Sequence, residues 1–129
     1  MDFEKVIRQR KMIREYIANK QIPEELIMRL IKNVHRAPSA GHTQVQEFII
    51  LKDSITKKKL RKVTVDQEYV ELAPVLIIVC SNTSRSINRM RGRESYSIID
   101  GAFATMIILS AVNEEIGAAF VGAFEDDKV

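Results

Sequence analysis

The feature that most constrains the fold is an unbroken apolar run, residues 75–80 (VLIIVC), which follows Pro74. Apolar residues without polar alternation are typical of a strand that is buried on both faces. A second segment, residues 101–112, has no charged side chain, so we expect it to be buried almost all round, within a helix over residues 95–116 that ends near Gly117. The chain therefore combines a buried strand with a buried helix.

Hydrophobic spacing predicts the other elements. Apolar residues at helical spacing indicate helices over residues 2–10 and 23–36, and residues 54–63 read as a polar helix. Short apolar runs at 48–51 and 118–121 indicate two more strands, and residues 64–72 are ambiguous. The class is α/β or α+β. We favour α+β, with at least three strands, because the pieces do not alternate as regular βαβ units.

Composition limits the classes of function. A chain of 129 residues that is 46% hydrophobic and 29% charged fits one globular domain over residues 1–129. One cysteine excludes an internal disulfide framework and a cysteine zinc site, and two separated histidines argue against a histidine-rich metal site. The net charge of +3 permits an anionic ligand without demanding nucleic acid. With a charged N-terminus and no run long enough to cross a membrane, we expect a soluble, cytoplasmic protein.

Four cations near the N-terminus form the first candidate site: Arg8, Arg10, Lys11 and Arg14. On a continuing helix, Arg10 would fall in the middle of the apolar stripe made by Phe3, Val6, Ile13 and Ile17, where a guanidinium must find an anion. Arginine is well shaped to bind phosphate through two parallel hydrogen bonds. The alternative is that the helix ends near Arg10 and these side chains are solvated, or paired with Glu4 and Glu15.

Two segments of small residues form further candidates. In the loop Pro38-Ser39-Ala40-Gly41-His42-Thr43-Gln44, small residues would let a flat ligand approach the backbone, although an ordinary connecting loop has the same composition. Gly122 directly follows a predicted strand, and ligands of layered sheets often lie beyond strand ends. Ser39 and His42 have no carboxylate placed to complete a triad, so we assign no catalytic side chain and expect bound-cofactor chemistry.

The order of these segments resembles the nitroreductase family of FMN-dependent oxidoreductases. Arg10-Lys11-Met12-Ile13-Arg14-Glu15-Tyr16 resembles the family's opening Arg-Arg-Ser-x-Arg-x-aromatic motif. Arg36-Ala37-Pro38-Ser39-Ala40-Gly41-His42-Thr43-Gln44 resembles its Ala-Pro-Ser-Ala-x-Asn-x-Gln loop. The segments Gln67-Glu68-Tyr69-Val70 and Phe120-Val121-Gly122-Ala123-Phe124 are similar to family segments in the same order, so the resemblance spans nearly the whole chain.

The resemblance implies an α+β fold with a central mixed sheet flanked by helices, and an intertwined homodimer with two FMN sites at its interface. It assigns the FMN phosphate, ribityl chain and pyrimidine edge to Arg10, Lys11, Met12 and Arg14. Pro38, Ser39, Ala40 and His42 would reach the same flavin from the partner subunit, with Gly122 near the central ring and Gln67 at the ring edge. The implied reaction is ping-pong hydride transfer through flavin N5, from NAD(P)H to a nitroaromatic, a quinone or a similar electron-poor acceptor.

The chain departs from the family pattern at several points. Met12, His42 and Val45 stand where the family often has Ser, Asn and Pro. Family members usually continue beyond the position of Val129, through another helix and a tail, so we expect the C-terminal part of the usual domain to be absent from this sequence. Two alternatives stay open: a non-catalytic FMN-binding member, or a small basic nucleic-acid-binding domain that uses residues 57–62 and 85–93.

Overall fold

The computed structural model describes residues 2–17, 19–87, 98 and 101–129. Its α-helices are α1 (Phe3–Gln9), α2 (Glu24–Val34), α3 (Ser54–Val63), α4 (Glu68–Leu72), α5 (Thr83–Ile87) and α7 (Met106–Asn113). The strands are β1 (Gln46–Leu51) and β2 (Leu76–Ser81), and the 3-10 turns are η1 (Ala40–His42), η2 (Phe103–Thr105) and η3 (Asp126–Lys128). This mixture confirms the α+β class expected from the sequence.

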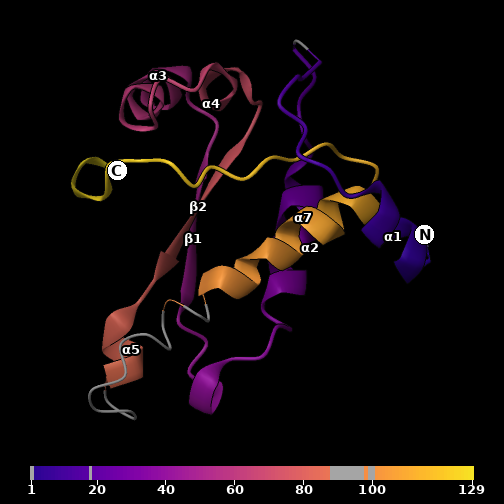
Figure 1. Cartoon of the computed structure of the whole chain (residues 1–129), viewed down its shortest axis with the longest axis vertical. Coiled ribbons are helices and arrows are strands. Elements are labelled where there is room, and N and C mark those ends of the chain that lie inside the picture. The colour runs from indigo at the N-terminus through magenta and orange to yellow at the C-terminus, as the bar shows by residue number, and fades with distance from the viewer. Residues whose placement is uncertain (1, 18, 88–97, 99–100) are drawn as a thin grey trace.

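The two strands form one long antiparallel ribbon. Gln46 lies opposite Ser81 and Leu51 lies opposite Leu76. Helices α3 and α4 connect the strands at one end of the ribbon, and α5 and η1 lie at the other end (Figure 1). Loops at the two ends of this ribbon are therefore far apart within one chain.

The core lies where α2 packs against α7. Helix α2 buries one face, made by Ile27, Leu30, Ile31 and Val34, as the spacing over residues 23–36 predicts. Two polar contacts hold the same pair of helices together. The Asn33 amide donates to Ser110 Oγ at 3.4 Å, and Arg29 Nη1 lies 3.1 Å from Glu114 Oε2.

The third predicted strand, residues 118–121, does not form within the described part of the chain. These residues have no regular secondary structure, and the sheet of the described residues contains β1 and β2 alone. Ala118 instead accepts a backbone hydrogen bond from Ile13, at 2.9 Å, in the segment that follows α1. A single backbone hydrogen bond does not make a pair of strands. The predicted mixed sheet would also need a strand that runs parallel to β1 or β2.

The sequence predicts that β2 and residues 101–112 are almost fully buried, and this prediction is also wrong for the described chain. Every residue of β2 is half-buried rather than buried. In the helical segment that includes η2 and α7, only Ala104, Ile108 and Ala111 are buried. The described residues therefore leave part of the apolar surface of β2 and α7 uncovered.

The long helix ends earlier than the sequence predicts. Residues 95–97 and 99–100 lie outside the described residues, and α7 ends at Asn113. Glu115 takes the left-handed position after the helix, with φ of 58°, and the N–H of Ile116 bonds the carbonyl of Ala111 at 2.8 Å. This is the Schellman arrangement, so Glu115, and not Gly117, occupies the position that usually favours glycine.

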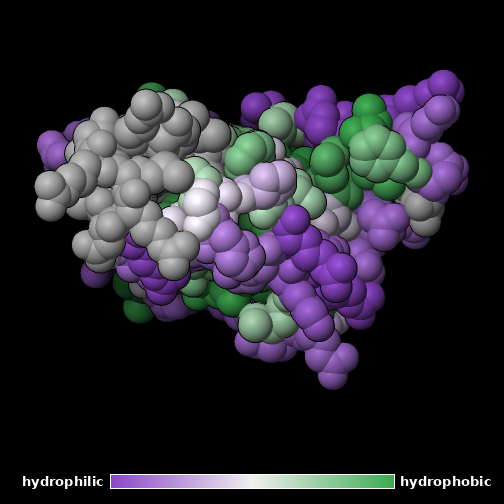
Figure 2. Space-filling view, turned by 90° about the horizontal axis from the view of Figure 1, so that it is seen from below, coloured by the Kyte–Doolittle hydropathy of each residue, from purple (hydrophilic) through white to green (hydrophobic). Residues whose placement is uncertain are grey.

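Helix α3 has the bounds that the sequence predicts, and the carboxylate of Asp53 caps it by accepting from the N–H of Thr56 at 2.6 Å. Apolar side chains also reach the surface, among them Phe3, Ile7 and Met28, which are 72%, 46% and 50% exposed. Seen from below, hydrophobic surface gathers toward the end of the molecule where α1 lies (Figure 2). None of the described helices has the length and apolarity that crossing a membrane requires.

Candidate functional site

The segment after α1 carries the predicted basic cluster. Helix α1 ends at Gln9, and Arg10 already has extended backbone angles, φ −60° and ψ 120°. The expectation that Arg10 lies within an apolar helix face is therefore wrong, because that stripe requires the helix to continue to Ile17. Arg10, Lys11 and Arg14 are exposed, as the alternative predicts.

The cations of this cluster differ in their partners. Arg8 lies 3.7 Å from Glu4, one turn earlier on α1. No carboxylate of the described residues lies within ion-pair distance of Arg10, Lys11 or Arg14. Three positive charges in five positions are therefore available for an anion that comes from outside the described chain.

The backbone around Met12 lies against the C-terminal segment. In addition to the bond between Ile13 and Ala118, the N–H of Phe120 points to the sulfur of Met12 at 3.4 Å. Met12 thus takes part in a contact to the chain itself, where the family often has a serine hydroxyl. The contact holds the segment that contains Gly122 close to the basic cluster.

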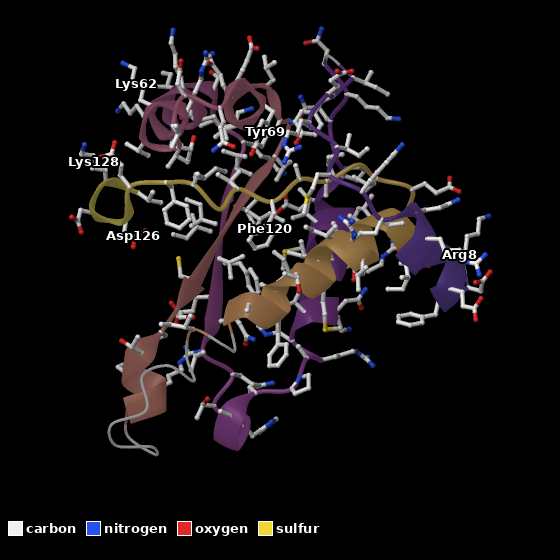
Figure 3. All side chains as sticks on the ribbon, in the orientation of Figure 1. Arg8, Lys62, Tyr69, Phe120, Asp126 and Lys128 are labelled. Atoms are coloured by element: carbon white, nitrogen blue, oxygen red, sulfur yellow. The ribbon has the colours of Figure 1, made fainter. Side chains whose placement is uncertain are left out.

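The start of α4 completes this part of the site: Gln67 is the residue just before the helix, and Tyr69 lies in its first turn. The Tyr69 hydroxyl lies 2.5 Å from Gln67 Oε1 and 3.4 Å from the carbonyl of Phe120. The guanidinium of Arg14 lies 5.5 Å from the centroid of the Tyr69 ring. Figure 3 shows Tyr69 beside the segment that follows α1, with Phe120 on the C-terminal segment below it.

Sequence reasoning did not select Tyr69 or Phe120. Each lies two residues from a predicted site residue, Gln67 or Gly122, and that proximity was the available signal. Their contact joins positions 51 residues apart, which only the fold reveals.

Tyr16 lies half-buried beside this group. Burial raises the pKa of its phenol, the neighbouring Tyr69 raises it further, and the positive charge of Arg14 acts in the opposite direction. A phenol with a raised pKa stays neutral at ordinary pH. The neutral phenol of Tyr16 therefore does not compensate the positive charge of Arg14.

Gly122 borders open space. A β-carbon built on Gly122 would meet no atom within 4 Å, so a flat molecule has room to approach its backbone. The carbonyl of the next residue, Ala123, accepts a hydrogen bond from the Gln67 amide at 3.2 Å. The structure therefore brings four predicted residues into one region: Met12, Arg14, Gln67 and Gly122.

The second predicted group lies elsewhere. Pro38, Ser39, Ala40 and His42 belong to the turn around η1, where Ser39 Oγ accepts from the N–H of Gln44 at 3.1 Å. This turn lies at the opposite end of α2 from the basic cluster (Figure 1). Since an 11-residue helix is about 16 Å long, the two groups do not meet within one chain.

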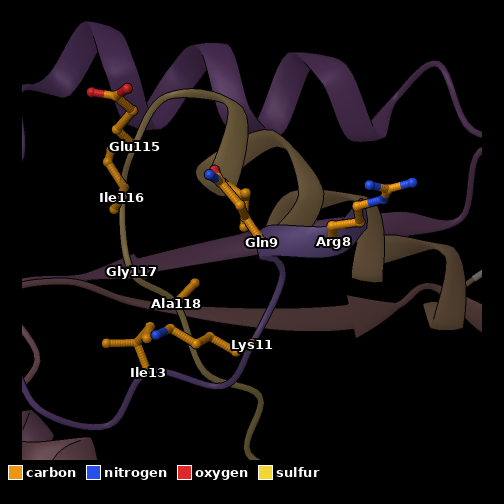
Figure 4. A pocket seen from close by; sticks show the side chains of 9 residues that line it. Arg8, Gln9, Lys11, Ile13, Glu115, Ile116, Gly117 and Ala118 are labelled. Carbon is orange, nitrogen blue, oxygen red and sulfur yellow. The ribbon is translucent and has the colours of Figure 1, made fainter. Parts of the chain in front are cut away.

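A shallow pocket of about 450 Å³ lies between the segment after α1 and the turn after α7. Ile13 and Ala118 are among its apolar lining residues, and Arg8 and Glu115 stand on opposite sides of it (Figure 4). Of the candidate site residues it contains Arg8 and Lys11, whereas Arg10, Met12, Arg14, Gln67 and Gly122 do not line it. It is therefore a neighbour of the candidate site and not its centre.

Several cations of the second basic region, residues 57–62 and 85–93, contact other parts of the fold. Lys57, in the helix expected to be polar, is buried, and its side chain donates to the carbonyl of Ala73 at the end of α4, at 2.5 Å. Arg61 pairs with Asp66 and Glu71, and Arg85 pairs with Glu47. Three arginines of the alternative nucleic-acid surface, at positions 89, 91 and 93, lie outside the described residues.

Among the described residues, no group of three or more His, Cys, Asp or Glu side chains is placed to hold a metal ion. The site offers cations, amide and hydroxyl groups, and open space beside a glycine backbone. This donor set suits a flat molecule that carries a phosphate.

The fold and site place the chain in a known structural class. A crystal structure of a nitroreductase family protein from Clostridium novyi NT superposes with a TM-score of 0.87 and 28% identity, covering 99% of this chain and 73% of that one. The architecture is therefore the nitroreductase fold.

The chain belongs to the nitroreductase family, whose sequence model matches residues 7–71. A Methanothermobacter thermautotrophicus relative, named for NADH dehydrogenase/NAD(P)H nitroreductase activity, is 30% identical over all of this chain and 65% of its own length. Human iodotyrosine deiodinase 1 is 25% identical over 86% of this chain and 47% of its own length. The chain thus spans about half to two thirds of the length of these curated relatives.

Proposed function

We propose that this chain is an FMN-dependent oxidoreductase that works as a homodimer and uses NAD(P)H to reduce an electron-poor acceptor, such as a nitroaromatic or a quinone. One subunit would contribute Arg10, Lys11, Met12, Arg14, Gln67 and Gly122 to each FMN site. The second group would be the partner subunit's Pro38, Ser39, Ala40 and His42. Membership of the nitroreductase family supports this class of reaction.

The observation that carries the proposal is the set of cations without carboxylate partners. Within the described residues, Arg10, Lys11 and Arg14 have no ion pair, whereas Arg8, only two residues before Arg10, is paired with Glu4. A phosphate carries the negative charge and the oxygen acceptors that such side chains bind best. The same charges would also stabilise the negative charge that gathers on a reduced flavin.

The rest of the donor set also fits FMN. The open space at Gly122 suits the approach of a planar ring, and Gln67 offers a hydrogen-bonding group beside it. When bound, FMN supplies two-electron transfer between a nicotinamide cosubstrate and an acceptor. The residues of this chain would bind the phosphate, orient the ring and leave one face of it open, so no catalytic side chain is assigned.

A second copy of the chain accounts for two further observations. The turn of residues 38–42 lies too far from Arg10 of its own chain, so only the partner's turn could reach the same cofactor (Figure 1). The chain also exposes 8833 Å², whereas a compact monomer of 14.7 kDa exposes about 6,900 Å². The half-covered apolar side chains of β2 and α7 supply surface for an interface between copies.

A second candidate is reductive dehalogenation of an aromatic substrate. The similarity that favours it is to human iodotyrosine deiodinase 1, which extends over 86% of this chain. Both candidates need the same bound cofactor and differ in the acceptor. An experiment that compares electron acceptors therefore separates the two candidate functions.

The proposal is tested by absorbance of the protein purified with FMN, before and after anaerobic addition of NADH or NADPH. We expect flavin absorption at about 450 nm that fades on addition of the nicotinamide. It should return when a nitroaromatic, a quinone or 3-iodotyrosine is added, and the acceptor that restores it fastest identifies the substrate class. A yellow protein that neither nicotinamide bleaches would identify a non-catalytic FMN-binding member. A colourless protein whose DNA or RNA mobility shift weakens with salt would favour the nucleic-acid alternative.

A further inference from the structure

The turn around η1 has an unusual backbone. His42 and Gln44 have φ of 55° and 47°, in the left-handed region that residues with a β-carbon seldom adopt. Gly41 is also left-handed, with φ of 58°. Such a backbone persists only where its surroundings hold it in place.

Hydrogen bonds within the turn fix part of this backbone. The N–H of His42 bonds the carbonyl of Ser39 at 3.1 Å, and Ser39 Oγ accepts from the N–H of Gln44 at 3.1 Å. The Thr43 hydroxyl donates to the carbonyl of Ala40 at 2.8 Å. None of these bonds uses the carbonyl of Gln44, where the turn leads into β1.

Arg85 of α5 bonds that carbonyl. Its Nη1 lies 3.2 Å from the oxygen of Gln44, and its Nη2 lies 3.0 Å from Glu47 Oε1 on β1. One guanidinium therefore contacts both the end of the turn and the strand that follows. The two residues between these contacts, Val45 and Gln46, are buried.

Arg85 is itself held against the ribbon. The Asn82 amide donates to the same Glu47 oxygen at 2.9 Å, and the N–H of Arg85 bonds the carbonyl of Asn82 at 3.2 Å. The N–H of Asn82 bonds the carbonyl of Val45 at 2.8 Å, which extends the pairing of β1 and β2 by one bond. The ribbon thus fixes Arg85, and Arg85 fixes Gln44 at the end of the ribbon where α5 and η1 lie (Figure 1).

We propose that Arg85 is a positioning residue that holds residues 38–44 in the conformation that reaches the cofactor bound by the partner subunit. This inference rests on the proposed function, which assigns this turn to the partner's FMN site. Arg85 acts through the turn, and Glu47 balances its charge. Its effect on FMN binding is therefore one of geometry.

The experiment compares Arg85→Ala and Arg85→Lys with the wild type, by titration of flavin fluorescence with FMN. Lysine keeps the charge but lacks the planar fork that bonds two partners side by side. We expect both variants to bind FMN about three- to tenfold more weakly than the wild type. Wild-type affinity in either variant would overturn the inference while leaving the proposed function intact. If the wild type binds no FMN, the proposed function is wrong and the inference falls with it.

Arg29→Ala is the matched control. Arg29 is exposed to a similar extent, 56% against 50% for Arg85, and is also paired, with Glu114 at 3.1 Å. Its ion pair joins α2 to α7 and leaves the turn untouched, so we expect its loss to change FMN affinity by less than about twofold. Equal losses in Arg29→Ala and Arg85→Ala would mean that any lost ion pair weakens binding, and would overturn the positioning role.

A second readout needs no cofactor. In the cofactor-free protein, nuclear magnetic resonance measures how fast the backbone N–H groups of His42 and Gln44 exchange with solvent. Arg85→Ala should accelerate both exchange rates, and Arg29→Ala should not. Unchanged rates in Arg85→Ala would contradict the hold of Arg85 on the turn.

Mixed dimers test in which subunit Arg85 acts. When one subunit carries Arg10→Ala and the other carries Arg85→Ala, both changes fall on the same cofactor site and the second site is unaltered. When one subunit carries both changes and the other carries neither, each site has one change. We therefore expect one site of wild-type affinity in the first dimer and none in the second. The reverse pattern would mean that Arg85 acts on its own subunit's cofactor, and would overturn the inference.

Discussion

The backbone N–H of Ile13 donates to the carbonyl of Ala118 at 2.9 Å, which joins the segment after α1 to the segment after α7. The side chain of Ile13 also lies against Gly117, the residue before Ala118. This contact places Arg10 to Arg14 alongside the chain that leads to Gly122. The candidate site therefore depends on a close approach of the Ile13 side chain to Gly117, which a larger residue at position 117 would prevent.

Gly117→Ala should lower stability. The added β-carbon would lie 2.8 Å from Ile13 Cγ2 and 3.0 Å from Ile13 Cβ, closer than side chains tolerate. We expect the free energy of unfolding to fall by about 1–3 kcal/mol, measured by urea denaturation. Gly122→Ala is the control, because its β-carbon would meet nothing within 4 Å and should change the stability by less than about 0.5 kcal/mol. Similar stabilities for the two variants would contradict the close approach.

Glu115→Gly should raise stability. Glu115 has φ of 58° at the end of α7, where a β-carbon is unfavourable and glycine is not. We expect a gain of about 1 kcal/mol in the free energy of unfolding. Glu115→Ala removes the charge but keeps the β-carbon, so it should show no such gain. A gain of the same size in both variants would mean that the charge, and not the backbone, is responsible.

Arg10→Ala should weaken FMN binding by about ten- to a hundredfold, because it removes a charge-assisted hydrogen-bond donor to the phosphate. Arg8→Ala is the matched control: Arg8 is also exposed but is paired with Glu4, and we expect its loss to change the affinity by less than about twofold. The affinities come from titration of flavin fluorescence. Equal losses in the two variants would contradict the assignment of Arg10 to the phosphate.

The Asp53 cap of α3 should make stability depend on pH. Hydrogen bonds from the Thr56 side chain and backbone lower the pKa of this carboxyl below its ordinary value of 3.8. A lowered pKa in the folded state gives stability that is present above 3.8 and is lost as the pH falls through the folded value. The urea midpoint of the wild type should therefore fall more steeply below about pH 4 than that of Asp53→Ser, whose hydroxyl caps without titrating. Parallel curves would contradict this role.

The local elements were largely predictable from the sequence, because their signals are local. Helix α3 has its predicted bounds since Asp53 caps it, and α2 buries the stripe that helical spacing predicts. The turn at Val65 and Asp66 was ambiguous because it has left-handed residues without glycine. The end of α7 was misplaced for the same reason, at Glu115.

What the sequence could not show depends on contacts between distant positions. The pairing of residue 118 with Ile13 in place of a strand, and the group formed by Gln67, Tyr69 and Phe120, join segments more than 50 residues apart. The burial predicted for β2 was wrong for the described residues because an apolar run does not distinguish a strand that is buried on both faces from one that is only half-buried. The basic cluster was identified as a candidate, but only the structure shows that Arg10, Lys11 and Arg14 have no carboxylate partner among the described residues.

The most direct test of the central claim is native mass spectrometry of the protein purified in the presence of FMN. The proposal of a cofactor held between two copies predicts an assembly of two chains with two FMN molecules, and loss of FMN whenever the assembly separates into single chains. A single chain that retains FMN, or paired chains that bind none, would contradict it.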